Sequence, residues 1–204
     1  IAYLLKKSDL KLAELATFRP SVCNRLDRNT SGLVTAGKSL AGLQQLSEIL
    51  RDRTVKKYYL TIVDGVIKDR QKIEGYLLKN EMTNQVKILK EAKGEAKPIA
   101  TEYIPLADNG QQTILKVHLI TGRTHQIRVH TQYAGHPIAL DDKYGDKEFD
   151  KYMQDLGLNR LFLHAFSIRF EHPKTGETLR LNAQLDEKMK AILKKLRESK
   201  EINP

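Results

Sequence analysis

The sequence is poor in cysteine and lacks tryptophan, long apolar runs and an initial methionine. Its single cysteine, Cys23, excludes a disulfide within the chain and is typical of a reducing compartment. No apolar run approaches the roughly 20 residues of a membrane-spanning helix, and nothing resembles a signal peptide. We therefore expect a cytoplasmic protein without membrane association. Because the chain begins at Ile1, we also expect further residues before it.

Acidic residues are fewer than basic ones, and this excess of positive charge indicates the class of partner. The 204 residues include 35 Lys and Arg against 25 Asp and Glu, which gives a net charge of +10 and a pI near 9.6. Such a bias favours nucleic acid as the partner over an anionic membrane surface. An apolar share of 40% supports a sizeable core and argues against disorder. We expect a single domain over residues 1–204, with residues 1–20 leading into its core.

Hydrophobic periodicity predicts an α+β fold with a mostly antiparallel sheet and flanking helices. Ser39 begins one expected helix and Asp186 caps another, which carries Met189, Ile192, Leu193 and Leu196. His172 to Gly176 reads as a hairpin turn. The expected helices cover residues 39–51, 124–134 and a closing segment after 186, and the expected strands cover residues 57–63, 86–89, 101–104, 113–120, 161–170 and 178–182.

A run around Asp27 has the composition of a loop. Asp27 lies between Arg25 and Arg28, and Asn-Thr-Ser-Gly follows at residues 29–32. These residue types favour turns over the interior of a helix or strand. Taken by itself, such an aspartate is most simply a residue that caps a neighbouring turn.

A second run, residues 119–130, places hydrogen-bond donors in a turn and at the helix start that follows it. Thr124 can cap a helix that ends before Gly135. The free N–H groups of a helix start favour phosphate. A shielded carboxylate and a donor-rich helix start are together the parts of a site for an anionic ligand that bears a base.

These runs resemble the RNA pseudouridine synthase family. The family loop His-Arg-Leu-Asp-x-x-Thr-Ser-Gly is present with Asn24 in place of the histidine, and the family segment Thr-Gly-Arg-Thr-His-Gln-Ile-Arg-Val-His is complete at residues 121–130. The resemblance extends from about residue 21 to at least residue 176. It is closest to the large-subunit ribosomal synthase C subfamily at residues 135–146 and 157–164. Further motif matches lie at residues 57–65, 135–145 and 161–165.

The resemblance implies a pseudouridine synthase catalytic fold with a central RNA-binding cleft. It also implies that Asp27 is the catalytic carboxylate, that Arg128 pairs with it and that Tyr59 stacks on the target uracil. Arg25 takes the place of the flipped nucleotide in the RNA stack. Pseudouridine formation breaks and remakes one glycosidic bond without hydrolysis or electron transfer, so we expect no cofactor. Whether Asp27 acts as a nucleophile or removes a proton stays open.

Several neighbouring residues receive RNA-binding or structural expectations. Arg123, His125 and Gln126 are expected to contact RNA or to support the Asp27 loop. Leu163 either packs under the base or belongs to a core strand. Tyr58 and Cys23 are expected to be structural.

We expect no metal site. The spacing of His125, His130 and His136 does not place two imidazoles on one helix face, and no cysteine or acid pair accompanies them. A hydrolytic nuclease would require paired carboxylates and a metal. Asp141 and Asp142 are the only adjacent pair near the motifs, and we expect one of them to brace the structure.

The expected function is pseudouridine formation in structured RNA, with large-subunit ribosomal RNA as the leading substrate and tRNA as the alternative. A different class of function, a non-catalytic RNA-binding factor in ribosome assembly, also fits a basic chain of this fold. The intact Asp27, Tyr59 and Arg128 argue against it. We expect a monomer. A small RNA-binding domain often precedes the catalytic domain in this family, and it would lie outside the given sequence.

Overall fold

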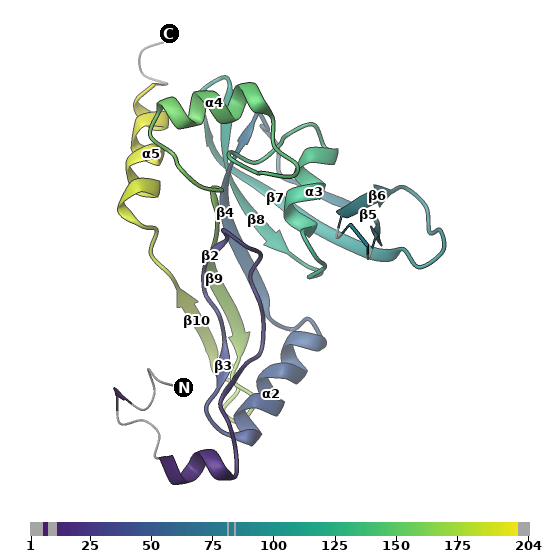
Figure 1. The fold of residues 1–204 in the computed structure, drawn as a ribbon, viewed down its shortest axis with the longest axis vertical. Coiled ribbons are helices and arrows are strands. Elements are labelled where there is room, and N and C mark those ends of the chain that lie inside the picture. The colour runs from purple at the N-terminus through teal and green to yellow at the C-terminus, as the bar shows by residue number, and fades with distance from the viewer. Residues whose placement is uncertain (1–5, 8–11, 81, 84, 200–204) are drawn as a thin grey trace.

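A central antiparallel sheet organises the molecule, as predicted. The computed structural model describes residues 6–7, 12–80, 82–83 and 85–199. Within these residues an eight-stranded sheet follows the order β10-β9-β4-β8-β7-β5-β6, with β2 joined to β9 outside that path (Figure 1). Every pairing along the main path is antiparallel, and only the short β2–β9 pairing is parallel. The strands of this sheet are β2 (Ser31–Gly32), β4 (Lys56–Asp64), β5 (Gln71–Asn80), β6 (Gln85–Leu89), β7 (Lys97–Asp108), β8 (Gln112–Leu119), β9 (Leu163–Glu171) and β10 (Thr178–Asn182).

Strand β4 is buried on both faces because alternate residues supply two cores. Tyr59 and Val63 belong to the core on the face that carries helix α3 (Gln126–Tyr133). Ile62 belongs to the opposite core, which helices α4 (Lys147–Asp155) and α5 (Glu187–Glu198) cover. The site described below therefore lies on the α3 face of the sheet.

The predicted helix ends are confirmed at two helices. Ser39 caps α2 (Leu40–Arg51) by accepting the amide N–H of Gly42 at 3.2 Å. Asp186 caps α5 by accepting the amide N–H of Met189 at 2.8 Å. Because α5 then buries Met189, Ile192 and Leu196 against the sheet, its predicted apolar face is also confirmed.

The predicted start of the third helix is wrong. Helix α3 begins at Gln126, and its N-cap is His125 in the left-handed region (φ 52°), without a side-chain cap within the described residues. Thr124 therefore does not cap it. The side chain of Gln126 instead accepts the Arg123 N–H at 3.1 Å and the Thr121 hydroxyl at 2.7 Å. These bonds continue the preceding turn up to the first helical residue.

A smaller lobe lies at the lower end of the sheet in Figure 1. It contains the 3-10 helix Leu12–Ala16, strands β1 (Ser21–Val22) and β3 (Ala36–Gly37), and α2. Helix α2 packs closely on β3, because a Cβ added to Gly37 would come within 2.5 Å of the Leu43 Cβ. No residue of this fully described helix is buried. The first part of the expected lead-in, residues 1–5 and 8–11, lies outside the described residues.

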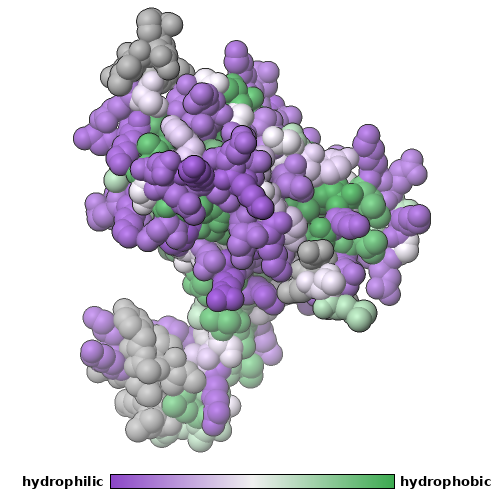
Figure 2. Space-filling model, turned by 45° about the horizontal axis from the view of Figure 1, so that its top comes forward, coloured by the Kyte–Doolittle hydropathy of each residue, from purple (hydrophilic) through white to green (hydrophobic). Residues whose placement is uncertain are grey.

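The surface view supports this division of the molecule. Figure 2 shows a larger part joined to a smaller one through a narrower waist, with hydrophilic side chains over most of the larger part on that face. None of the described helices combines the length and the apolar character that crossing a bilayer requires.

Candidate active site

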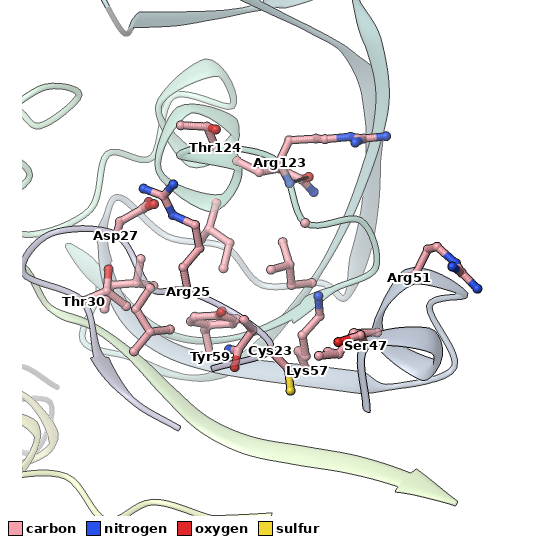
Figure 3. A pocket seen from close by; sticks show the side chains of 18 residues that line it. Cys23, Arg25, Asp27, Thr30, Ser47, Arg51, Lys57, Tyr59, Arg123 and Thr124 are labelled. Carbon is pink, nitrogen blue, oxygen red and sulfur yellow. Dashed lines mark hydrogen bonds between the residues drawn. The ribbon is translucent and has the colours of Figure 1, made fainter. Parts of the chain in front are cut away.

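A cavity of about 440 Å³ lies where the Asp27 loop, strand β4, helix α2 and the turn before α3 meet. Figure 3 shows Asp27 and Thr30 on one side of this opening, Tyr59 and Lys57 along its floor, and Arg51 on the opposite side. We call it the Asp27 cavity. It brings together six of the eight residues that the sequence assigned to a site, and its lining includes Asp27, Arg25, Tyr59, Arg123, Gln126 and Leu163.

The Asp27 loop is closed at its base by bonds between its two ends. The Cys23 N–H donates to the Thr35 carbonyl at 2.8 Å. The Asn24 Oδ1 accepts both the N–H of Thr35 at 2.7 Å and its hydroxyl at 2.9 Å. Asn24, the departure from the family motif, therefore supports the loop. Cys23 is half-buried and lines the cavity, so its thiol is not the buried structural group that we expected.

The far end of the loop is fixed to strand β9. Ser31 and Gly32 pair with His164 and Ala165 in the parallel bridge, and the Ser31 Oγ lies 2.7 Å from the His164 Nδ1. Gly32 has φ +113°, and a Cβ there would lie 2.2 Å from the Ala165 carbonyl oxygen. Only glycine fits this contact. Asp27 thus lies in a loop that is held at both ends.

Tyr59 faces the same cavity from β4. Tyr59 is 8% exposed. Burial, together with the charge of Asp27, raises the pKa of Tyr59 to about 12. The pairing of β4 with β9 shifts register between Tyr58 and Tyr59, and such bulges re-aim side chains. Tyr58 points to the other face of the strand, where its ring stacks on that of His118 with 4.8 Å between the centroids, which fits the structural role expected for it.

Arg128 does not pair directly with Asp27, contrary to the prediction. Its Nε donates to Asp141 Oδ2 at 2.7 Å, and its Nη2 donates to Asp141 Oδ1 at 2.6 Å and to Asp142 Oδ1 at 2.7 Å. The Arg128 side chain is 3% exposed and the Asp141 side chain 0%. Asp141 is also fixed by the N–H groups of Lys143 and Tyr144, so it presents a preformed bidentate acceptor.

Asp27 nevertheless acts on Arg128 through its charge. Burial acts to lower the pKa of Arg128, but the hydrogen bonds and charge of Asp141 outweigh it, and Asp27 adds to the rise. The pKa is therefore raised. The prediction that one of the two adjacent acids braces the structure is confirmed, because Asp141 holds Arg128 in place.

Gln126 supports the turn before α3, whereas the sequence predicted that it contacts RNA or supports the Asp27 loop. The residue is 2% exposed. In addition to its bonds to Thr121 and Arg123, its Nε2 donates to the Ala100 carbonyl at 3.0 Å and to the Thr101 hydroxyl at 2.9 Å. All its polar capacity is therefore directed into the protein, which fixes Arg123 and Thr124 at the cavity wall.

The other residues that the sequence assigned to the site differ in their position relative to the Asp27 cavity. Arg25 is exposed and lines it, and Leu163 is 2% exposed and forms part of its floor. His125 is half-buried beside the cavity, and its Nδ1 lies 3.1 Å from the Tyr144 hydroxyl. Burial lowers the pKa of His125, and the charge of Asp27 partly opposes this.

The sequence prediction missed the contribution of Lys57 and of α2. Lys57 lines the cavity, and burial, followed by the charge of Arg53, lowers the pKa of its ammonium group. Its position two residues before Tyr59 on a strand places both on one face, which was the available signal. Ser47 and Arg51 line the cavity from α2, and no local pattern connects that helix to the motifs. Among the described residues, no group of three or more His, Cys, Asp or Glu could hold a metal ion.

Comparison with known proteins gives consistent results. A sequence profile of the family described as RNA pseudouridylate synthase matches residues 2–133. Relatives from Haemophilus influenzae and Pasteurella multocida, both named ribosomal large subunit pseudouridine synthase C, are 58% and 53% identical over 87% and 93% of this chain. These matches cover 55% and 60% of the two relatives, so the chain spans little more than half their length.

A solved structure has the same fold. Human RNA Pseudouridylate Synthase Domain Containing 1 superposes with a TM-score of 0.70 and 25% sequence identity, covering 96% of this chain and 87% of that one. The superposition therefore extends over nearly the whole chain.

Proposed function

The chain belongs to the RNA pseudouridylate synthase family, and from this premise we propose that it converts uridine to pseudouridine in large-subunit ribosomal RNA. The observation that carries the proposal is the meeting of Asp27 and Tyr59 in one cavity whose walls bear several cations. The cavity joins a carboxylate, an aromatic face and phosphate-binding groups. These are the groups that a reaction on a single RNA base requires.

Asp27 is the proposed catalytic carboxylate. The reaction breaks the bond between the ribose C1′ and uracil N1, turns the base and forms a bond from C1′ to C5. A carboxylate can either attack C1′ or remove a ribose proton. In both routes C5 loses its proton when the new bond forms and N1 ends with a proton, so the product has the same atoms as the uridine. No hydrogen bond or ion pair reaches the Asp27 carboxylate from the described residues, which leaves its oxygens available to the substrate.

Tyr59 is proposed to stack on the target base. Its ring forms part of the cavity floor with Leu163, and stacking on an aromatic face contributes about 1–3 kcal/mol without reading base identity. A base in folded RNA must leave its stack to reach this floor, at a cost of a few kcal/mol. Arg25, exposed at the cavity edge, is suited to fill the vacated position with its planar guanidinium group.

Arg128 is proposed to act through its charge. Asp141 holds it rigidly, and Asp27 interacts with it without a direct hydrogen bond. A fixed cation near a carboxylate stabilises negative charge there and limits its movement. Arg123 and His125 at the start of α3 are proposed RNA contacts, with Gln126 holding the turn that presents them.

The names of the relatives support the ribosomal substrate. We also propose a single catalytic domain that acts as a monomer, because one cavity on one face of the sheet is sufficient to hold the target base. We propose that it works in the cytoplasm, where ribosomal RNA is modified, and that it needs no cofactor.

The test is a map of pseudouridine in ribosomal RNA and tRNA from cells with and without the protein. Carbodiimide labelling followed by primer extension identifies each modified position. The proposal expects loss of pseudouridine at one or a few large-subunit positions. Loss confined to tRNA would keep the chemistry and overturn the substrate, and an unchanged map would contradict the proposed activity.

A further inference from the structure

A second cavity lies on the other side of the turn that leads into α3. It has a volume of about 320 Å³ and is lined by parts of β5, the start of β7 and the turn itself. We call it the Lys97 cavity. It shares Gly122, Arg123 and Thr124 with the Asp27 cavity, so the two openings lie back to back across a single turn.

Cations outnumber acids in the described lining of the Lys97 cavity. It contains Lys79 of β5, Lys97 at the start of β7 and Arg123 of the turn, with Glu95 as the acid among them. Lys97 is exposed, and Lys79 is half-buried on the arm that β5 and β6 form. A concave surface with an excess of cations attracts an anionic ligand.

Arg123 connects the two cavities. Its Nε is covered from solvent and has no hydrogen-bond partner among the described residues. In Figure 3 its side chain extends away from Asp27, while Thr124 next to it stays near Asp27. A covered donor without a partner is costly unless a ligand supplies an acceptor, and a phosphate oxygen is a suitable one.

Gly122 adds no side chain to the turn that separates the two cavities. It is exposed, and its φ lies outside the left-handed region, so the backbone itself does not require glycine. A Cβ at this position would lie 3.1 Å from the Lys57 Nζ in the Asp27 cavity. The missing side chain leaves room for an extended ligand to pass from one cavity to the other.

We propose that the Lys97 cavity binds the ribose-phosphate backbone of the nucleotides next to the target uridine. The inference rests on the proposed function, because it takes a single RNA strand to enter the Asp27 cavity and cross Gly122. Lys79, Lys97 and Arg123 then contact consecutive phosphates. Such contacts fix the register of the strand without reading its sequence.

The test measures the salt dependence of RNA binding rather than catalysis. The probe is a single-stranded oligouridylate of nine nucleotides, and fluorescence anisotropy gives its Kd between 50 and 300 mM salt. Each lost phosphate contact on a single strand reduces the log–log salt slope by about 0.7. We expect the double variant Lys79→Gln/Lys97→Gln to reduce the slope by about 1.4 and Lys97→Gln alone by about 0.7.

The matched control is Lys147→Gln/Lys151→Gln on α4, which removes the same charge from two exposed positions away from both cavities. It should leave the slope unchanged. An equal change in the control, or no change in the Lys79/Lys97 variants, would overturn the inference.

The outcome is separable from that of the proposed function. A reduced slope together with an unchanged pseudouridine map would support the RNA subsite and reject the activity. An unchanged slope together with a changed map would reject the subsite and keep the activity.

Discussion

At the scale of single residues, the central feature is the choice of partners by the buried Arg128 guanidinium group. Arg128 donates its hydrogen bonds to Asp141 and Asp142, and Asp27 influences it only through its charge. The pair of Arg128 and Asp141 is almost completely buried. This arrangement places a fixed positive charge beside Asp27 while its carboxylate stays available for chemistry.

We predict that Arg128→Ala lowers the free energy of unfolding by about 3–5 kcal/mol, because it leaves the buried Asp141 carboxylate without its partner. Urea denaturation followed by circular dichroism measures this. The control is Arg70→Ala, which breaks the exposed pair with Glu102 and should cost at most about 1 kcal/mol. Equal stability of the two variants would contradict the buried pair.

Family motifs in the sequence were sufficient to predict Asp27, Tyr59 and Arg25 in the cavity. The partners of Arg128 and Gln126 could not be predicted in this way. Gln126 donates hydrogen bonds to Ala100 and Thr101, which lie on strand β7, much earlier in the sequence. Such contacts depend on sheet pairing, which local residue patterns do not specify.

At the scale of elements, the short β2–β9 bridge determines where the Asp27 loop lies. Two residues form this parallel pairing, and the side chains of Ser31 and His164 add a hydrogen bond to it. Burial lowers the pKa of His164, which favours the neutral ring that can accept the Ser31 hydroxyl. The loop is therefore positioned by a small number of close contacts.

We predict that Gly32→Ala lowers both stability and pseudouridine formation, because the new Cβ would clash with the Ala165 carbonyl. The control is Gly176→Ala in the β9–β10 turn, where φ is also positive but no atom of the described residues lies within 4 Å of the added Cβ. The control carries backbone strain alone, about 1 kcal/mol. Thermal unfolding and a pseudouridine assay compare the two, and an active Gly32→Ala protein would refute the proposed role of the bridge.

Helix α3 contains a buried histidine that makes stability depend on pH. His130 is fully buried, and burial lowers its pKa from the ordinary 6.5 to about 4. The unfolded chain therefore binds more protons between these two values. Stability from this group is present above pH 6.5 and is lost as the pH falls toward 4.

A one-unit difference in pKa corresponds to about 1.4 kcal/mol, so the loss attributable to His130 is on the order of 3 kcal/mol. We predict that His130→Gln flattens the decline in stability below pH 6.5. Urea denaturation of both proteins at several pH values measures the difference. Parallel curves for the two would count against this explanation.

Helices and strands with a strong hydrophobic pattern were predicted from the sequence, and those with a weak pattern were missed. Strand β4 is aromatic and β-branched, and α5 has an apolar face, so both were found. Helix α4 was missed because only Phe149 and Met153 are buried in it. Strand β5 was also missed, since Gly75 and polar residues interrupt its pattern.

At the scale of the whole molecule, the two lobes differ in how firmly they are packed. The sheet has buried cores on both faces, whereas no residue of α2 is buried. The Asp27 cavity lies between them, with Ser47 and Arg51 contributing from α2. RNA in the cavity would therefore contact both lobes.

We predict that amides of α2 exchange with solvent faster than those of β4 and β8, because few buried contacts hold the helix. Binding of an oligouridylate should slow exchange in α2, while exchange in α4 should stay unchanged. Hydrogen–deuterium exchange with mass spectrometry measures both effects. Equal protection of α2 and β8 in the free protein would disagree with this expectation.

The most direct test of the account is the activity of Asp27→Asn on large-subunit ribosomal RNA that lacks pseudouridine. The variant preserves the size of the side chain and removes its charge, and Asp155→Asn at the exposed end of α4 is the control. We predict that Asp27→Asn folds and binds RNA but forms no pseudouridine in a single-turnover assay, while the control is as active as the wild-type protein. Pseudouridine formation by Asp27→Asn at the rate of the wild-type protein would contradict the catalytic role of Asp27.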